Sequence, residues 1–178
     1  MTLEIVQKGD PVLREKAADV AVEEITLPAT QNDIEAMHKA LASTQDGVAL
    51  AAPQIGISKR IFVIAPKAYD NYTDQPLVFI NPTITKRSKT KTWVDEGCLS
   101  VRWWYGKTHR HKQATVEAYN EAGVKFQLGG SGLIAQIFQH EIDHLDGILF
   151  DDHAEDLHEL DKEGHKQYKA AQEERKEQ

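Results

Sequence analysis

Residues 133–145 read LIAQIFQHEIDHL, and their periodicity decides how the rest of the chain must be arranged. Four of them recur at spacings of four, three and four residues, namely Leu133, Ile137, His140 and His144. This period is that of one face of an α-helix. We therefore predict a helix over residues 133–145 whose apolar face points into the core and carries both histidines.

The last part of this helix contains the motif H-E-x-x-H. His140 and His144 lie one helical turn apart and project from one face, so two imidazoles can reach one metal ion. Glu141, offset by about 100° around the helix, can lean over a metal-bound water. Burying two histidines and a glutamate without partners would be costly, and a metal ion removes most of that cost. The alternative is a solvent-facing helix that contains two histidines by chance.

A catalytic metal site of this kind needs a third protein ligand and keeps a fourth position for water. Glu155 and Glu159 follow the helix closely but lie in a charged stretch. The single cysteine, Cys98, lies upstream after a strand-like alternation over residues 90–94, and Gly97 allows a tight backbone path just before it. One thiolate and two imidazoles suit Zn²⁺ or Fe²⁺. A buried apolar cysteine without a ligand role is the alternative.

The composition is that of an ordinary globular domain, with 178 residues, 20.0 kDa, 40% hydrophobic and 28% charged residues. A net charge of −7 argues against a general nucleic-acid binder, so we expect no direct DNA binding. No apolar run approaches the roughly 20 residues that a membrane helix needs, and no secretory signal is visible. One cysteine cannot form an internal disulfide, which favours a reduced, cytoplasmic protein.

The order of the predicted elements indicates an α+β fold, in which antiparallel or mixed β-sheets pack around the central metal-binding helix. We predict a catalytic domain over residues 1–150 and a charged, helical tail over residues 151–178, which carries ten acidic and five basic residues. The predicted elements before the central helix are a helix over 32–44, strands over 61–64 and 77–80, and a hairpin of 114–118 with 124–128.

Glycines and histidines add local expectations. The run Gly129-Gly130-Ser131-Gly132 is expected to end the hairpin before the central helix, and Gly147 is expected to cap that helix at its C-terminal end. The tail histidines His153, His158 and His165 are expected to be surface residues.

Three segments stand in order along the chain: GVALAAPQ at 47–54, EGCLS at 96–100 and QHEIDH at 139–144. Together they closely resemble the three signature motifs of the peptide deformylases. GDPVLR at 9–14 is similar to the N-terminal segment of that family, and the order of strands and helices is similar over about residues 3–152. The resemblance implies a metallohydrolase that uses metal-bound hydroxide to remove the N-terminal formyl group from N-formylmethionyl nascent peptides, releasing formate.

The resemblance also implies a role for each matching residue. The metal would be bound by Cys98, His140 and His144, with Fe²⁺ as the usual ion and Zn²⁺, Ni²⁺ or Co²⁺ as alternatives. Glu141 would be the acid and base, while the Gln54 side-chain amide and the Leu99 backbone N–H would hold the oxyanion. Backbone groups of Val48, Ala49 and Gly97 would bind an extended peptide, and Leu133, Ile137 and Val48 would line the methionine pocket.

The chain departs from the family pattern at several positions. Ala49 stands where a second glycine is usual, Gln136 replaces an apolar or basic residue, and residues 101–106, VRWWYG, carry an aromatic run instead of a proline. Trp103 and Trp104 could form a lip over the peptide cleft, unless one of them packs on the core.

Two other functions remain open from the residues alone. One is a zinc endopeptidase with a third ligand other than Cys98, and the other is a metal-dependent binding module without turnover. Because the implied substrate emerges on ribosomes, we also expect a transient ribosome contact, although an acidic tail would be repelled by RNA.

Overall fold

The computed structural model describes residues 4–167 and residue 170. The helices are α1 (Pro28–Ala42) and α2 (Gly132–Leu145), with short 3₁₀ turns η1 (Pro11–Arg14), η2 (Val22–Glu24), η3 (Ala52–Ile55), η4 (Pro66–Ala68) and η5 (Phe150–Asp152). The strands are β1 (Ala49–Ala51), β2 (Ile61–Ile64), β3 (Val78–Arg87), β4 (Lys91–Cys98), β5 (Val101–His111), β6 (Gln113–Tyr119), β7 (Lys125–Ser131) and β8 (Glu155–Glu159).

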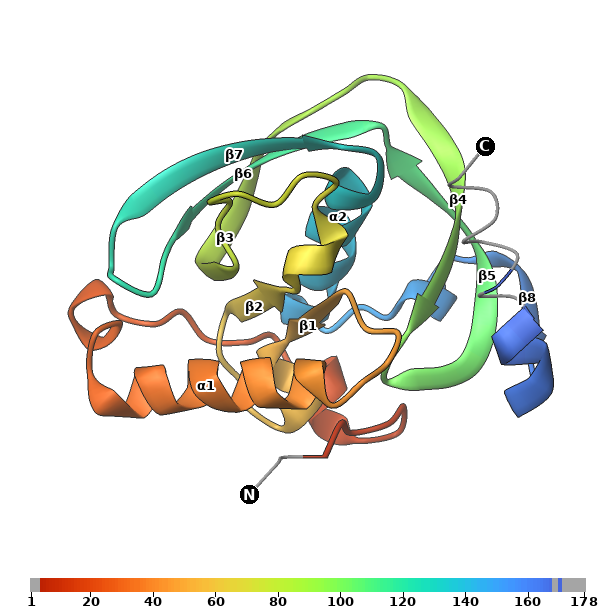
Figure 1. Cartoon of the computed structure of the whole chain (residues 1–178), viewed down its shortest axis with the longest axis horizontal. Helices are drawn as coiled ribbons and strands as arrows, with labels where there is room; N and C mark the ends of the chain where they lie inside the picture. Colours follow the sequence, from red (N-terminus) through yellow and green to blue (C-terminus); the bar gives the residue numbers. More distant parts are fainter. Residues whose placement is uncertain (1–3, 168–169, 171–178) are drawn as a thin grey trace.

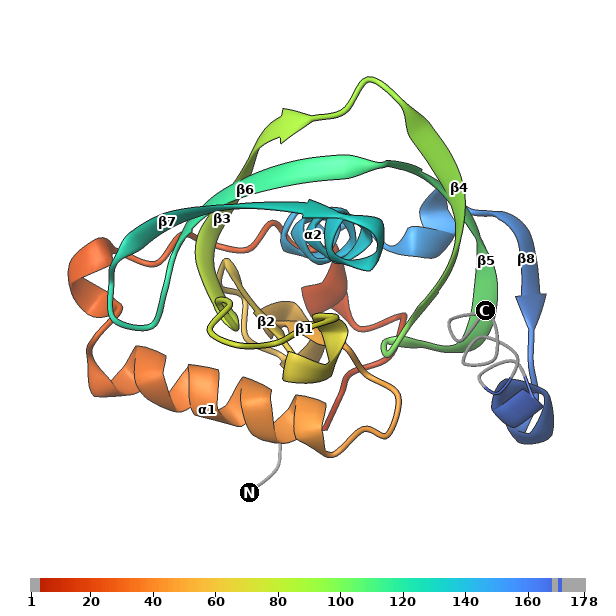
Figure 2. The same ribbon diagram turned by 45° about the horizontal axis from the view of Figure 1, so that its top comes forward.

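The strands form two antiparallel sheets on either side of α2. The larger sheet has the order β1-β2-β3-β6-β7, and the smaller has the order β4-β5-β8. Figure 1 shows α2 at the centre of the molecule, with α1 lying along one side of the larger sheet. Figure 2 shows β6 and β7 arching over α2, while β4 and β5 flank it on the other side. The predicted α+β fold around a central helix is confirmed.

The apolar face of α2 packs on aromatic residues of the larger sheet. The rings of Phe62 and Phe79 stack with centroids 4.5 Å apart, and the Phe138 ring of α2 lies 5.6 Å from that of Phe79. All three side chains are fully buried. This packing fixes the helix from which the histidines project.

One local expectation at the start of α2 is wrong. The glycine run does not end the hairpin, because β7 continues through Gly129 and Gly130 to Ser131. A Cβ atom on Gly130 would lie 2.5 Å from Cγ2 of Ile134, so the glycine permits the close approach of α2 to the strand. Gly147, with φ +75°, follows the C-cap of α2 as expected.

The predicted helical tail is also wrong in its first part. Residues 155–159 form β8, which pairs with β5 so that His158 lies opposite Tyr105. Within the described part of the tail, the chain is helical over residues 162–167 and at residue 170, while residues 168–169 and 171–178 of the predicted tail lie outside the described residues. His165 is buried, contrary to the expectation of a surface residue.

The remaining elements agree closely with prediction. The first helix covers residues 28–42 rather than 32–44, because Pro28 starts it. The hairpin of β6 and β7 turns at Gly123, which has φ +76°. Within the described residues, neither helix has the length and apolar character that a bilayer crossing requires.

Candidate active site

Three ligand-type side chains converge at the centre of the fold. Cys98 ends β4, and His140 and His144 project from adjacent turns of α2. Their ligand atoms all lie within 4.8 Å of one another, and Cys98 Sγ is 3.2 Å from His144 Nε2. A thiolate and two imidazoles at this separation fit a single divalent ion with tetrahedral geometry. Residues distant along the chain are thus assembled into one potential metal site.

The orientation of His140 is set by a buried carboxylate. Its Nδ1 lies 2.6 Å from Oε1 of Glu96, which leaves Nε2 free to face Cys98 and His144. A carboxylate bonded to the outer nitrogen fixes the tautomer of a ligand histidine and makes it a stronger donor. Glu96 therefore supports the site without belonging to the three ligands.

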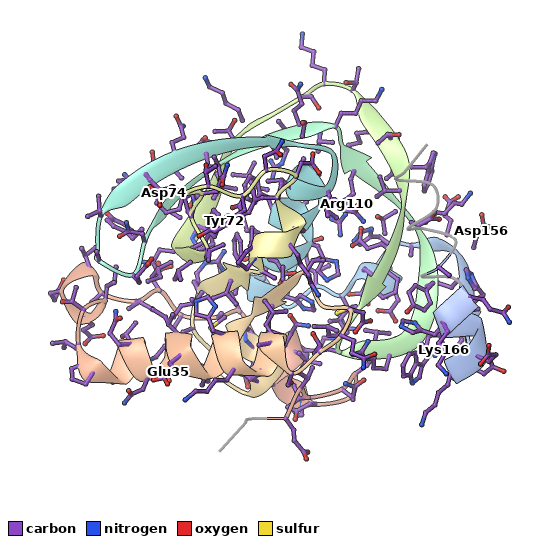
Figure 3. All side chains as sticks on the ribbon, in the orientation of Figure 1. Glu35, Tyr72, Asp74, Arg110, Asp156 and Lys166 are labelled. Carbon is purple, nitrogen blue, oxygen red and sulfur yellow. The ribbon has the colours of Figure 1, made fainter. Side chains whose placement is uncertain are left out.

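Glu96 is held by further partners in a buried network. Arg110 donates to both of its oxygens, at 2.5 and 3.1 Å, and Thr108 Oγ1 also donates to it. Burial by itself would raise the pKa of Glu96, but the charges and hydrogen bonds of His140 and Arg110 outweigh it and hold the pKa well below its usual range. Arg110 also pairs with Asp143 of α2 at 2.6 Å. In Figure 3, Arg110 lies between the smaller sheet and α2, which it connects.

Arg110 and Asp143 were not predicted from the sequence, and Glu96 was given no role. The stretch GKTHRH at 106–111 shows no apolar alternation, so the burial of Gly106, Thr108 and Arg110 on one face of β5 is seen only in the structure. A charged residue at an inward-facing position indicates a buried partner.

Glu141 carries a carboxyl group that is buried beside the ligand set. Its Oε2 has no hydrogen-bond partner in the part of the chain that the structure describes, and neither does Nδ1 of His144. Burial raises the pKa of Glu141 to about 7 despite the opposing charge of His140. A carboxyl group with this pKa can take up and release a proton near neutral pH.

His144 has the protonation that a metal ligand requires. Burial and the neighbouring His140 hold the pKa of His144 well below its usual range, so the ring is neutral. A neutral imidazole can coordinate a metal directly. Burial alone would lower the pKa of His140, but Glu96 and Cys98 raise it well above its usual range, so His140 must release a proton when it binds a metal.

Gln54 points its amide nitrogen at the same place. Its Oε1 accepts a hydrogen bond from the Ala51 backbone N–H at 2.8 Å, so Nε2 is directed to Cys98 Sγ at 3.5 Å and Ser100 Oγ at 3.2 Å. Gln54 lies in η3, where it is 1% exposed. Leu99 directly follows Cys98, in the tight turn that joins β4 to β5.

These residues face one cavity of about 180 Å³. Its lining includes the predicted residues Val48, Ala49, Gln54, Gly97, Cys98, Leu99, Leu133, Ile137, His140 and Glu141. His144 is buried behind them at 1% exposure and does not line the cavity. The structure thus gathers the predicted peptide-binding residues and two of the three predicted ligands, Cys98 and His140, around one space.

The outer part of the cavity differs from expectation. Neither Trp103 nor Trp104 belongs to its lining, so the predicted tryptophan lip is wrong. Trp103 has a left-handed backbone with φ +69°, and its ring packs against His165 instead. Arg102 and Tyr105, which flank the tryptophan pair, line the cavity in their place.

Comparison with known proteins agrees with this geometry. A sequence model of the polypeptide deformylase family matches residues 2–160, so the match includes β8 and passes the domain boundary predicted at residue 150. A peptide deformylase of Halothermothrix orenii is 43% identical over 152 residues, which cover 84% of this chain and 92% of that protein. Peptide deformylase 2 of Clostridium acetobutylicum is 44% identical over 144 residues, which cover 80% and 89%.

Solved structures show the same fold. The peptide deformylase of Thermotoga maritima superposes with a TM-score of 0.76 at 35% identity, covering 87% of this chain and 99% of that one. A class I type b peptide deformylase from Acinetobacter baumannii with Met-Ala-Ser bound gives 0.76 at 33% identity, covering 85% and 98%. The chain therefore belongs to the polypeptide deformylase family.

Proposed function

We propose that this protein removes the formyl group from N-formylmethionyl peptides of nascent proteins and releases formate. The observation that carries the proposal is the convergence of Cys98, His140 and His144 beside the buried carboxyl of Glu141, which has an oxygen without a partner. This combination supplies a metal site and a proton-transfer group within one cavity.

We propose that Cys98, His140 and His144 hold one divalent ion. When bound, such an ion lowers the pKa of a water molecule towards about 7 and polarises the formyl carbonyl, whose bond to nitrogen is to be broken. The mixed sulfur and nitrogen donors suit Fe²⁺ and Zn²⁺. We propose Fe²⁺ as the ion used in the cell, with Zn²⁺, Ni²⁺ or Co²⁺ as substitutes. A thiolate beside Fe²⁺ is prone to oxidation, which would make the iron form sensitive to air.

The groups around the metal site transfer the proton and stabilise the negative charge that develops on the carbonyl oxygen. Glu141 takes a proton from the attacking water and passes it to the leaving nitrogen, for which its pKa of about 7 is suited. The amide of Gln54 and the backbone N–H of Leu99 donate to the carbonyl oxygen as it becomes negative. Because these donors are already positioned, little reorganisation is needed during the reaction.

Two sheet edges offer backbone groups to the peptide. β1 is the terminal strand of the larger sheet and β4 that of the smaller sheet, and Ala49 of β1 and Gly97 of β4 both line the cavity. An extended peptide can add to such edges through main-chain hydrogen bonds. The apolar lining residues Val48, Leu133 and Ile137 would receive the methionine side chain. A relative has been solved with Met-Ala-Ser bound, which supports the binding of a peptide that begins with methionine.

The alternatives fit the geometry less well. An endopeptidase would need a third ligand other than Cys98, yet the Cys98 Sγ lies 3.2 Å from the His144 Nε2. A binding module without turnover would have no use for the buried Glu141 carboxyl. We keep a transient ribosome contact and a cytoplasmic location as parts of the proposal, because the substrate is a nascent chain.

The direct test is formate release from formyl-Met-Ala-Ser by anaerobically purified protein, with its metal content measured in the same preparation. We expect turnover that scales with the bound metal. Metal-loaded protein that releases no formate would overturn the proposed function.

A further inference from the structure

The C-terminal segment of the described chain lies against the outer part of the cavity. We call residues 155–165 the C-terminal strap. Its strand β8 pairs with β5, with Glu159 opposite Trp104, and Leu160 then donates a backbone hydrogen bond to Trp103 O at 2.7 Å. Figure 1 shows β8 running beside β5 and the chain then folding back in a short helical turn. His165 lies in this turn and contacts Tyr105 and Trp103 of β5.

His165 contacts two residues that line the cavity. Its Nδ1 is hydrogen-bonded to the hydroxyl of Tyr105, and its Nε2 lies 3.4 Å from Oδ2 of Asp46. The ring also packs edge-on against Trp103, with centroids 4.4 Å apart. The His165 side chain is only 11% exposed, so these contacts are shielded from solvent.

Asp46 in turn fixes a third residue of the cavity lining. Its two carboxylate oxygens accept hydrogen bonds from both terminal nitrogens of Arg102, at 2.8 and 3.2 Å. This bidentate geometry holds a guanidinium in one plane. The Arg102 Cζ also lies 5.2 Å from the centroid of the Trp103 ring. We call Asp46, Arg102 and Tyr105 the outer wall of the cavity, and His165 contacts two of its three members.

The outer wall is more exposed to solvent than the proposed methionine pocket. Arg102 is 27% exposed, whereas Ile137 in the proposed methionine pocket is 4% exposed. Peptide residues that follow the methionine extend from the buried end towards the exposed end. They would therefore meet the outer wall, while the formyl group and the methionine would not.

We propose that His165 is a positioning residue that sets the outer wall for the part of the substrate beyond the methionine. This inference rests on the proposed function. It assigns a role to one departure from the family pattern, because the aromatic run at residues 101–106 provides the surface on which the strap docks. His165 does not line the cavity, and among the described residues it contacts the outer wall through Tyr105 and Asp46.

The test compares a long and a short substrate in the full chain carrying His165→Ala. For formyl-Met-Ala-Ser, we expect KM to rise about 5-fold with kcat within about 2-fold, since two net hydrogen bonds to the wall are lost. For N-formylmethionine amide, which ends before the outer wall, we expect both constants to stay within about 2-fold. A purely structural role would change both substrates by the same factor.

Two variants make the comparison specific. His165→Asn places an amide near the position of Nδ1, so it should restore the Tyr105 contact and part of the KM for the longer peptide. His109→Ala is the matched control. His109 is a β5 residue that does not line the cavity, and its imidazole stacks on the Trp93 ring with centroids 4.7 Å apart. We expect His109→Ala to leave the ratio between the two substrates unchanged.

The outcomes separate this inference from the proposed function. If the wild type releases no formate, the proposed function and the positioning role of His165 are both wrong. If the wild type is active and His165→Ala changes the two substrates equally, or changes neither, the positioning role is wrong and the proposed function stands. If His165→Ala does not fold, the same comparison with His165→Asn and His165→Gln decides, since each keeps only one of the two polar contacts.

Discussion

At the buried end of the cavity, His140 and Gln54 are each held by a close and buried partner, whereas the outer wall is more exposed and is braced by the C-terminal strap. His140 is held by Glu96 and Glu96 by Arg110, all largely buried. The outer wall combines residues 46, 102 and 105 and is braced by residue 165. The buried arrangement suits catalysis, because small displacements of the reacting groups lower the rate. The outer wall suits recognition of the peptide residues that follow the methionine.

If this contrast is correct, changes at the buried end should abolish turnover and changes at the outer wall should alter substrate preference. The largest effect is expected from Cys98→Ala. Removal of the thiolate leaves two imidazoles, so we expect loss of bound metal and formate release at the background of the assay. Elemental analysis and formate detection check this result. Retained metal together with peptide-bond cleavage would favour the endopeptidase.

Glu141→Ala should separate metal binding from catalysis. Because Glu141 lies outside the Cys98, His140 and His144 ligand set, we expect wild-type metal content and a loss of about 10²–10⁴-fold in kcat. Glu121→Ala, which changes an exposed glutamate in the turn between β6 and β7, is the matched control and should be neutral. Unchanged activity in Glu141→Ala would remove the proposed proton-transfer role.

Gln54→Ala should lower kcat by about 10²–10³-fold, because one donor to the developing oxyanion is lost. Gln54→Glu is the informative companion, since a glutamate can still accept the Ala51 N–H but cannot offer the same amide donor. We expect both variants to be impaired in steady-state formate release. Activity that survives in Gln54→Glu would show that the side chain serves to accept the Ala51 backbone N–H and does not stabilise the oxyanion.

Glu96→Gln should weaken metal binding by about 10- to 100-fold, because the carboxylate that orients His140 is neutralised. Competition with a chelator measures this change. Thr108→Val removes another hydrogen bond to Glu96 without touching His140, so its effect should be smaller. Equal effects of the two variants would contradict the proposed role of Glu96. The His165→Ala comparison described above has the smallest expected effect and tests the outer wall.

The same contrast explains what could be predicted from the sequence. The central helix and its histidines were predictable because helical period, apolar flanks and H-E-x-x-H coincide within a few residues. Cys98 was found because it is the single cysteine of the chain. Partners joined by strand register were not found, since Arg110 meets Glu96 only after β4 and β5 are aligned.

The C-terminal strap shows a different kind of failure. The sequence EDLHE of β8 has three acidic residues and all five residues are exposed, so it lacks the alternation that predicts a strand. It becomes a strand because β5 offers an edge for pairing. His165 was misjudged for a related reason, because a histidine in a charged stretch gives no sign that the chain folds back over an aromatic surface.

The position of β1 and β4 at the ends of their sheets has a consequence for the range of peptides that the enzyme can accept. A peptide lying between them would join the two sheets into one continuous surface wrapped around α2. The peptide would be bound through its backbone amides, and these are the same in every protein that a cell makes. The formyl group and the side chain of the initiating residue, with a smaller contribution from the outer wall, would then distinguish a substrate from any other extended chain.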